Sequence, residues 1–393
     1  MKHTRTGGLV ALAIAGSMAI SACGSNSNGS TAASTSRAAA ATSAAAAAAP
    51  TSAAAAASGA ATSAGGIAAA AACVSGSLSG AGSSFQGPMQ DQWAKDYAAK
   101  CSGAKVDYQP VGSGAGIQQF GAGTTLDFAG SDVPMKTDEQ AAADKRCGSP
   151  AWHLPITAGG IGVTWNLSGV TDLTFSADTL ADIFQGKVTT WDNAEIKADN
   201  PSATLPSTPI SVVYRSDSSG TNAVFTGYLA AESKKWTLGS GKTVQWPSGT
   251  GAQKSAGVAN AVKQTPGAIT YVEQAFATTN QLPLAKIKNG TAGVALTTAS
   301  VTAAIAGDAI TGTGNNLVAT VNFAPTDPTA YPISTLSYEI VCSKYSSAAK
   351  VPLLKGYLSY AAGAGQASAD KLGFSPLPSA IATKVATAIA AVS

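Results

Sequence analysis

The feature that most constrains this chain is a unit that recurs along it: an apolar strand-like run, a turn rich in Gly and Ser, and a helical stretch. Residues 74–78 begin the first unit, and its turn at 80–85 leads into a long helical segment. A second unit joins a strand at 106–111 to the turn 112–116 and a short helix at 117–120. Strands that alternate with helices in this way predict an α/β fold with mixed or parallel sheets.

The rest of the chain continues this α/β pattern over a length that suits two lobes. The 321 residues after position 72 are too many for one simple core. The Gly-rich apolar stretch at 156–165 is expected to be a strand that crosses between the lobes. We predict a first lobe from 73–157 with 332–393, and a second lobe from 158–331. The other expected elements are strands at 126–130, 210–214, 267–272 and 331–341, and helices at 176–184, 222–229 and 378–392.

The N-terminal region is typical of an export signal followed by a spacer. Lys2 and Arg5 precede an apolar run at 8–20 that is too short to span a membrane. The residues just before Cys23 match a bacterial lipobox, so 1–23 is predicted to be a lipoprotein signal peptide that ends at a lipidated Cys23. The alternative is a conventional signal in which Cys23 is incidental. Residues 24–72 are nearly all Ala, Ser, Thr and Gly, which predicts a disordered tether. The expected location is therefore the extracytoplasmic face of the cell membrane.

Four further cysteines bear on redox state and on metal binding. An even number in an exported chain indicates two disulfides, and four cysteines allow three connectivities. One of these, Cys73–Cys101 with Cys147–Cys342, would enclose the first strand and helix and tie two distant segments. A zinc site is the alternative. However, no CxxC motif occurs and His153 is the one His after the signal region, so we expect no metal and no cofactor.

Net charge limits the ligands that this chain can attract over a distance. The first 72 residues hold three of the 24 Lys and Arg and none of the 21 Asp and Glu. Residues 73–393 therefore carry a formal net charge of zero. Such a chain has no basic field for nucleic acid, so an anion has to be bound by local geometry.

Three of the turns combine features that favour anion binding. They are Ser83-Ser84, the stretch 112–116, and Ser219-Gly220-Thr221, which follows Arg215. A Gly/Ser turn at a helix start exposes backbone N–H groups at the positive end of the helix dipole, and hydroxyls add rotatable donors. Each turn alone is more often an ordinary cap. Together they lie at the carboxyl ends of expected strands, where open α/β sheets bind ligands.

Asp132 narrows the class of anion. A carboxylate repels a bound anion unless that anion carries a proton that the carboxylate can accept. Phosphate is protonated at neutral pH and sulfate is not, so Asp132 would favour phosphate. The alternative is a turn Asp that precedes Val133-Pro134.

Two enzyme-like patterns do not hold. The segment 239–243 resembles a P-loop, but the required Gly is replaced by Trp236, so we interpret it as a surface loop. A catalytic triad could use only His153, and phosphatase metal ligands are lacking. We therefore expect a protein that is not an enzyme.

Six segments together resemble the phosphate-binding subunit of bacterial phosphate ABC transporters, and the resemblance covers nearly all of residues 75–392. The segments are 80–85, 108–116, 127–134, 183–191, 215–221 with 225–226, and 267–271. The resemblance implies two α/β lobes with a hinge between them, a type II-like periplasmic-binding-protein fold. Its order and spacing make it specific. Ser84 stands where some relatives have Thr, and both residues supply a hydroxyl.

The resemblance also implies a set of phosphate contacts in this chain. The first lobe would supply the Ser84 hydroxyl, the Phe85 N–H, Ser113, and Asp132 as the acceptor of the ligand proton. The second lobe would supply Arg215, Ser219, Gly220 and Thr221, with Asp217 bracing Arg215. The implied function is capture of inorganic phosphate by hinge closure and delivery, as a monomer, to the permease subunits of an ABC importer. The alternatives are another oxyanion such as sulfate or molybdate, or a sensing or surface role on the same scaffold.

Overall fold

The computed structural model describes residues 73–393. The predicted signal peptide, the lipidated Cys23 and the tether lie outside the described residues. Within the described part of the chain, no helix is both long and apolar enough to cross a membrane.

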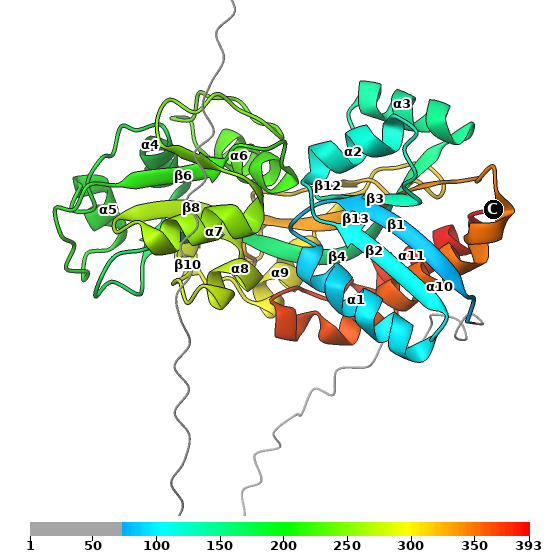
Figure 1. The fold of residues 1–393 in the computed structure, drawn as a ribbon. Coiled ribbons are helices and arrows are strands. Elements are labelled where there is room, and N and C mark those ends of the chain that lie inside the picture. The colour runs from blue at the N-terminus through cyan, green and yellow to red at the C-terminus, as the bar shows by residue number, and fades with distance from the viewer. Residues whose placement is uncertain (1–72) are drawn as a thin grey trace, which may run out of the picture. The chain divides into compact units, whose positions relative to one another are not determined.

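An eight-stranded mixed sheet forms the centre of the fold (Figure 1). Its order is β2-β1-β3-β13-β4-β8-β6-β7. The strands are β1 (Gly76–Gly82), β2 (Ala104–Gln109), β3 (Phe128–Ser131), β4 (Ala151–Trp165), β6 (Ser211–Arg215), β7 (Thr250–Ala252), β8 (Ala268–Glu273) and β13 (Ser334–Cys342). Strand β1 pairs in parallel with β2 and β3, whereas β13 pairs antiparallel with both β3 and β4.

The long strand β4 joins the two halves of the sheet. Its first part, residues 151–160, pairs with β13, and its last part, 161–165, pairs with β8. The predicted crossing at 156–165 therefore lies inside this strand, and the predicted two-lobed α/β fold is confirmed. The exact lobe limits at 157 and 332 stay a prediction, and "first lobe" and "second lobe" below mean the predicted ranges.

In the first lobe, helices cover both faces of the sheet (Figure 1). Helices α1 (Gly87–Lys100), α10 (Val351–Ala362) and α11 (Ser379–Ala391) lie on one face, and α2 (Ser113–Gly121) and α3 (Thr137–Cys147) lie on the other. Strand β1 serves both faces, since Leu78 packs in the cluster with Trp93 and Ala81 packs in the cluster with Phe120. This alternation is the period of two that a strand between two layers requires.

In the second lobe, aromatic side chains fill the core. Phe225 stacks on Tyr271 with ring centroids 4.2 Å apart, and Phe184 packs edge-on against Phe225. Two helices, α4 (Ala177–Phe184) and α6 (Gly220–Glu232), carry these phenylalanines, while α7 (Lys254–Gln264) packs on β6 and β8. The smaller elements of this lobe are α5 (Ala194–Asp199), α8 (Gln274–Thr279), α9 (Thr298–Ile305), β5 (Thr174–Phe175), β9 (Lys286–Asn289), β10 (Ala292–Val294), β11 (Ala309–Ile310) and β12 (Ala319–Thr320). The first lobe also contains three 3-10 turns, Ala348–Lys350, Ala364–Ser368 and Asp370–Leu372.

The structure selects one of the three disulfide connectivities. Cys73 pairs with Cys101 directly after α1, and Cys147 at the end of α3 pairs with Cys342 at the end of β13. The first disulfide closes a segment of 28 residues and the second a segment of 195 residues. Because a longer closed loop removes more entropy from the unfolded chain, the second disulfide contributes more in that model, about 5 kcal/mol at most.

Three local expectations differ from the structure. Strand β1 covers Gly76–Gly82, so residues 80–82 of the first expected turn belong to the strand. Helix α2 begins at Ser113 and not at 117, because Gly112 alone makes the turn with a φ of 97°. The segment 239–243 is a loop, as expected, but it is not simply a surface loop. The Lys242 side chain is only 6% exposed, because its Nζ binds both carboxylate oxygens of Glu139 at 2.6 Å.

Candidate functional site

The predicted site residues lie where strands of both lobes end. Ser84 follows β1, Asp132 follows β3, and Arg215 is the last residue of β6. Helix α2 begins at Ser113, after β2, and helix α6 begins at Gly220, after β6. Because β4 pairs antiparallel with β8, and β6 is parallel to β8, the carboxyl end of β6 points toward the carboxyl ends of β1 and β3. These groups from distant parts of the chain therefore meet where β4 passes from one half of the sheet to the other.

Asp132 lies in a cradle of serine hydroxyls in the first lobe. Oδ1 accepts hydrogen bonds from Ser83 Oγ at 2.5 Å and Ser337 Oγ at 2.7 Å, and Oδ2 accepts one from Ser113 Oγ at 3.1 Å. Burial raises the pKa of Asp132, while these hydroxyls and, more weakly, Arg215 act to lower it. Oδ2 accepts a hydrogen bond from only one of the three hydroxyls, so it can accept a hydrogen bond from another donor.

The second lobe approaches this carboxylate through Gly220. A Cβ atom at Gly220 would lie 2.5 Å from both Asp132 Oδ2 and Ser113 Oγ, a distance that real side chains do not adopt. Glycine is therefore required here for the close approach of the α6 backbone.

Arg215 is buried and held by Asp217. Its Nε and Nη2 donate to the two oxygens of Asp217 at 2.7 and 2.6 Å, and Nη1 donates to Thr221 Oγ1 and to Ser255 Oγ, each at 3.2 Å. Burial acts to lower the pKa of Arg215, but Asp217 outweighs it and the pKa is raised. The guanidinium is therefore charged and fixed in orientation.

The start of α6 presents backbone donors beside this arginine. The Ser219 side chain caps the helix by accepting from Asn222 N at 3.1 Å. The first intrahelical hydrogen bond runs from Ala223 N to Ser219 O. The N–H groups of Gly220 and Thr221 precede it, so they belong to those that a helix cannot satisfy internally.

Phe85 contributes only its backbone to this region. Its ring is fully buried and packs edge-on against Phe374 at 5.3 Å. That packing fixes the turn after β1 and therefore the direction of the Phe85 N–H, which is the predicted phosphate contact of this residue.

Four residues of the cluster were not predicted as contacts. Ser255 binds Ser84 and Arg215, Glu273 Oε1 accepts from Thr221 Oγ1 at 2.5 Å, and Ser83 and Ser337 bind Asp132. Burial raises the pKa of Glu273, opposed chiefly by the charge of Arg215. Ser255 is the second residue of α7, which follows the three-residue strand β7.

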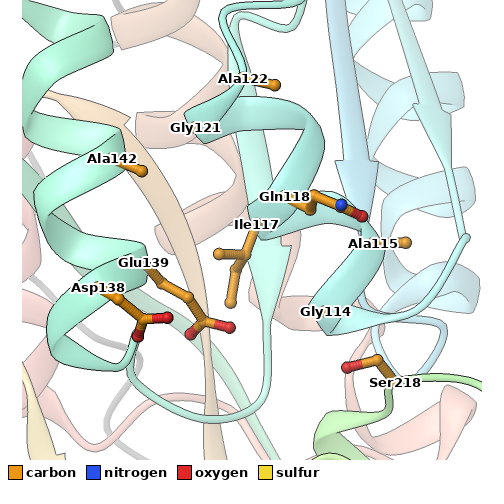
Figure 2. Close-up of a pocket in the computed structure, with 10 residues that line it drawn as sticks. All are labelled: Gly114, Ala115, Ile117, Gln118, Gly121, Ala122, Asp138, Glu139, Ala142 and Ser218. Atoms are coloured by element: carbon orange, nitrogen blue, oxygen red, sulfur yellow. The ribbon is translucent and has the colours of Figure 1, made fainter.

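Two further contacts join the lobes beside the cluster. Gly114 N donates to Ser218 O at 2.9 Å, and Lys242 pairs with Glu139. A groove of about 600 Å³ lies beside these contacts. Figure 2 shows Glu139 and Ile117 on its walls and Gly114 near Ser218 at one end. Asp132 and Arg215 do not line this groove, so it is separate from the cluster.

His153 is buried, and both ring nitrogens have hydrogen-bond partners. Its Nε2 accepts from Met135 N at 3.0 Å, and its Nδ1 lies 2.8 Å from Asn316 Oδ1, which requires the neutral tautomer with the proton on Nδ1. Burial lowers its pKa. Among residues 73–393, no three His, Cys, Asp or Glu side chains are grouped to hold a metal ion.

Comparison with known proteins connects this geometry to a family. The model of the PBP superfamily domain matches residues 67–364. Phosphate-binding protein PstS 3 of Mycobacterium tuberculosis (strain ATCC 25618 / H37Rv) is 42% identical over 321 residues, which are 80% of this chain and 86% of that protein. Phosphate-binding protein PstS 2 of the same strain is 38% identical over 402 residues and the full length of both chains. A high-affinity periplasmic phosphate-binding protein, PfluDING bound with phosphate, shares the fold with a TM-score of 0.66 at 22% identity, covering 79% of this chain and 93% of that one.

Proposed function

This chain belongs to the PstS family of phosphate-binding proteins within the PBP superfamily, and we propose from this membership and from the cluster geometry that it binds inorganic phosphate between Asp132 and Arg215. In this proposal it is a transport component and not an enzyme. It hands phosphate to the permease subunits of an ABC importer. The named relatives are all phosphate-binding proteins, which favours phosphate over sulfate, molybdate or a separate sensing or surface role.

The observation that carries the proposal is the meeting of Asp132, Gly220 and Arg215 from two lobes. The second lobe offers one buried guanidinium and the N–H groups at the start of α6, and the first lobe offers hydroxyls and the Phe85 N–H. A phosphate between them would receive donors on all sides. Because Asp217 already neutralises Arg215, attraction comes mainly from directed hydrogen bonds and not from net charge.

Asp132 gives the proposed site its preference for a protonated anion. Oδ1 is occupied by two hydroxyls, so Oδ2, beside Gly220, is the oxygen that would accept the phosphate proton. Sulfate has no proton to donate at neutral pH. Two buried anions would then face each other without a hydrogen bond, which a desolvated site rejects strongly.

Hinge closure is the proposed mechanism of capture. The lobes are connected by β4 and by the chain that leads into β13, and these would act as the hinge. Opening has to break the Gly114–Ser218, Lys242–Glu139 and Ser84–Ser255 contacts. We propose that the form with these contacts, with phosphate enclosed, is the one that the permease recognises. A monomer anchored at Cys23 on the extracytoplasmic face, with 24–72 as a tether, completes this proposal.

Isothermal titration of the purified protein with phosphate and with sulfate at neutral pH tests the proposed function. We expect tight phosphate binding and no measurable heat with sulfate. Loss of most of the phosphate affinity is expected for Arg215→Lys, which cannot bind Asp217 and the ligand in the same planar arrangement. Absence of phosphate binding by the unmodified protein would refute the proposal.

A further inference from the structure

Ser255 lies between groups of both lobes that the proposed function assigns to phosphate. Its Oγ is 2.9 Å from Ser84 Oγ and accepts from Arg215 Nη1 at 3.2 Å. Its backbone N–H also donates to Ser84 Oγ at 3.2 Å. The side chain is fully buried. One residue thus contacts a proposed phosphate group from each lobe.

Asp217 fixes the position of Ser255 as well as that of Arg215. Oδ1 of Asp217 accepts from Arg215 Nε at 2.7 Å and from Lys254 N at 3.0 Å. Lys254 has a φ of 64°, a left-handed conformation that is uncommon for a residue with a side chain. The start of α7 is therefore held against the arginine through a shared carboxylate, which makes Ser255 part of the same assembly.

The hydroxyl protons of the cluster can be counted, because each hydroxyl has one proton to donate. Those of Ser83, Ser113 and Ser337 go to Asp132, and that of Thr221 goes to Glu273. The hydroxyls of Ser84 and Ser219 have protons that are not committed to a carboxylate in this way. The Ser255 hydroxyl lies beside both Ser84 Oγ and the Glu273 carboxylate, whose pKa it acts to lower, so its one proton can go to either neighbour or to a ligand.

We propose that Ser255 is a further phosphate-contacting residue, which donates its hydroxyl to the same ligand oxygen that Ser84 and Arg215 bind. An oxygen that is hydrogen-bonded to both Ser84 Oγ and Arg215 Nη1 can lie beside Ser255 Oγ, which is itself within 3.2 Å of each group. In the present arrangement the two serine hydroxyls bind each other. A bound oxyanion, the stronger acceptor, takes both protons. The inference rests on the proposed function and adds a second segment, the start of α7, to the contribution that residues 215–221 make from the second lobe.

Calorimetric titration of the Ser255→Ala variant of the full chain with phosphate tests this role. We expect its affinity to fall by about tenfold to a hundredfold, the usual effect of one hydrogen bond to a charged group. Ser233→Ala, which changes a buried serine whose hydroxyl donates to Asp178 within the second lobe, should bind phosphate like the unmodified protein. Affinity for Ser255→Ala equal to or tighter than that of the unmodified protein would overturn the inference.

A second pair of variants separates contact from folding. Ser255→Thr keeps the hydroxyl, and Ser255→Val has the shape of the Thr variant without the hydroxyl. Only the Thr variant should therefore retain most of the phosphate affinity. Equal affinities of this pair would show that the hydroxyl does not reach phosphate. If the unmodified protein itself binds no phosphate, the proposed function fails. If it binds and the variants match it, only the role of Ser255 fails.

Discussion

Gly220→Ala should prevent the second lobe from closing on phosphate while leaving the contacts of the first lobe in place. The new methyl carbon would lie 2.5 Å from Asp132 Oδ2 and from Ser113 Oγ, about 1 Å inside ordinary contact. Asp132 cannot retreat easily, because three hydroxyls hold its carboxylate. The lobes therefore have to stay apart, and the second lobe loses its donors to the ligand.

The size of the effect follows from the contacts that closure supplies. If separation removes two charge-assisted hydrogen bonds, from the Arg215 guanidinium and the start of α6, the loss is about 3–6 kcal/mol. That corresponds to an affinity lower by about a hundredfold to ten-thousandfold. Titration calorimetry measures the affinity. Unfolding in urea without phosphate should change little, because Gly220 opens its helix and alanine is tolerated there.

Gly257→Ala is the matched control for this change. Gly257 lies inside α7, and a Cβ atom there would meet its nearest neighbours only at 3.8 Å. This variant should bind phosphate normally and gain about 0.5–1 kcal/mol of stability. Unchanged phosphate affinity for Gly220→Ala would refute the inferred approach of α6 to Asp132.

Two further predictions concern closure and pH. Lys242→Ala should weaken phosphate binding, by about tenfold, because it removes a nearly buried ion pair between the lobes; Lys235→Ala, whose partners Asp182 and Glu195 both lie in the second lobe, should not. Equal effects on phosphate affinity would contradict the closure role. His153 has a folded-state pKa below its ordinary value of about 6.5, so the unfolded chain binds the extra proton. Its contribution to stability is therefore present above pH 6.5 and lost as the pH falls below it, and His153→Gln should remove that part of the pH dependence in thermal unfolding; an identical pH profile for both proteins would contradict it.

Local patterns predicted much of the fold. Apolar runs that end in Gly/Ser turns predicted β1, β2 and β6, an apolar run without such a turn predicted β8, and a Ser cap predicted α4. The same turns predicted most residues of the cluster, because a helix start that follows a strand exposes its backbone N–H groups in any fold. The unit that carries Ser255 was missed because its strand, β7, has three residues and no apolar run.

The remaining features depend on segments far apart in the chain. Ser337 meets Asp132 because β13 pairs antiparallel with β3, a pairing between positions about 200 residues apart that no local pattern encodes. Lys242 seemed to belong to an exposed loop. It is buried because Glu139, 103 positions earlier, reaches it. The second oxygen of Glu273 has no hydrogen-bond partner among the described residues, and we have no physical account of it.

The role of Asp132 as acceptor of a ligand proton is the centre of this account. Titration of Asp132→Asn with phosphate and with sulfate measures it most directly, with Asp127→Asn as the control, since Asp127 is a nearby carboxylate that binds Lys350 and Ser79. The account predicts weaker phosphate binding and a smaller preference over sulfate for Asp132→Asn, because the amide can donate where the carboxylate only accepts. Phosphate affinity and selectivity both equal to those of the unmodified protein would contradict it.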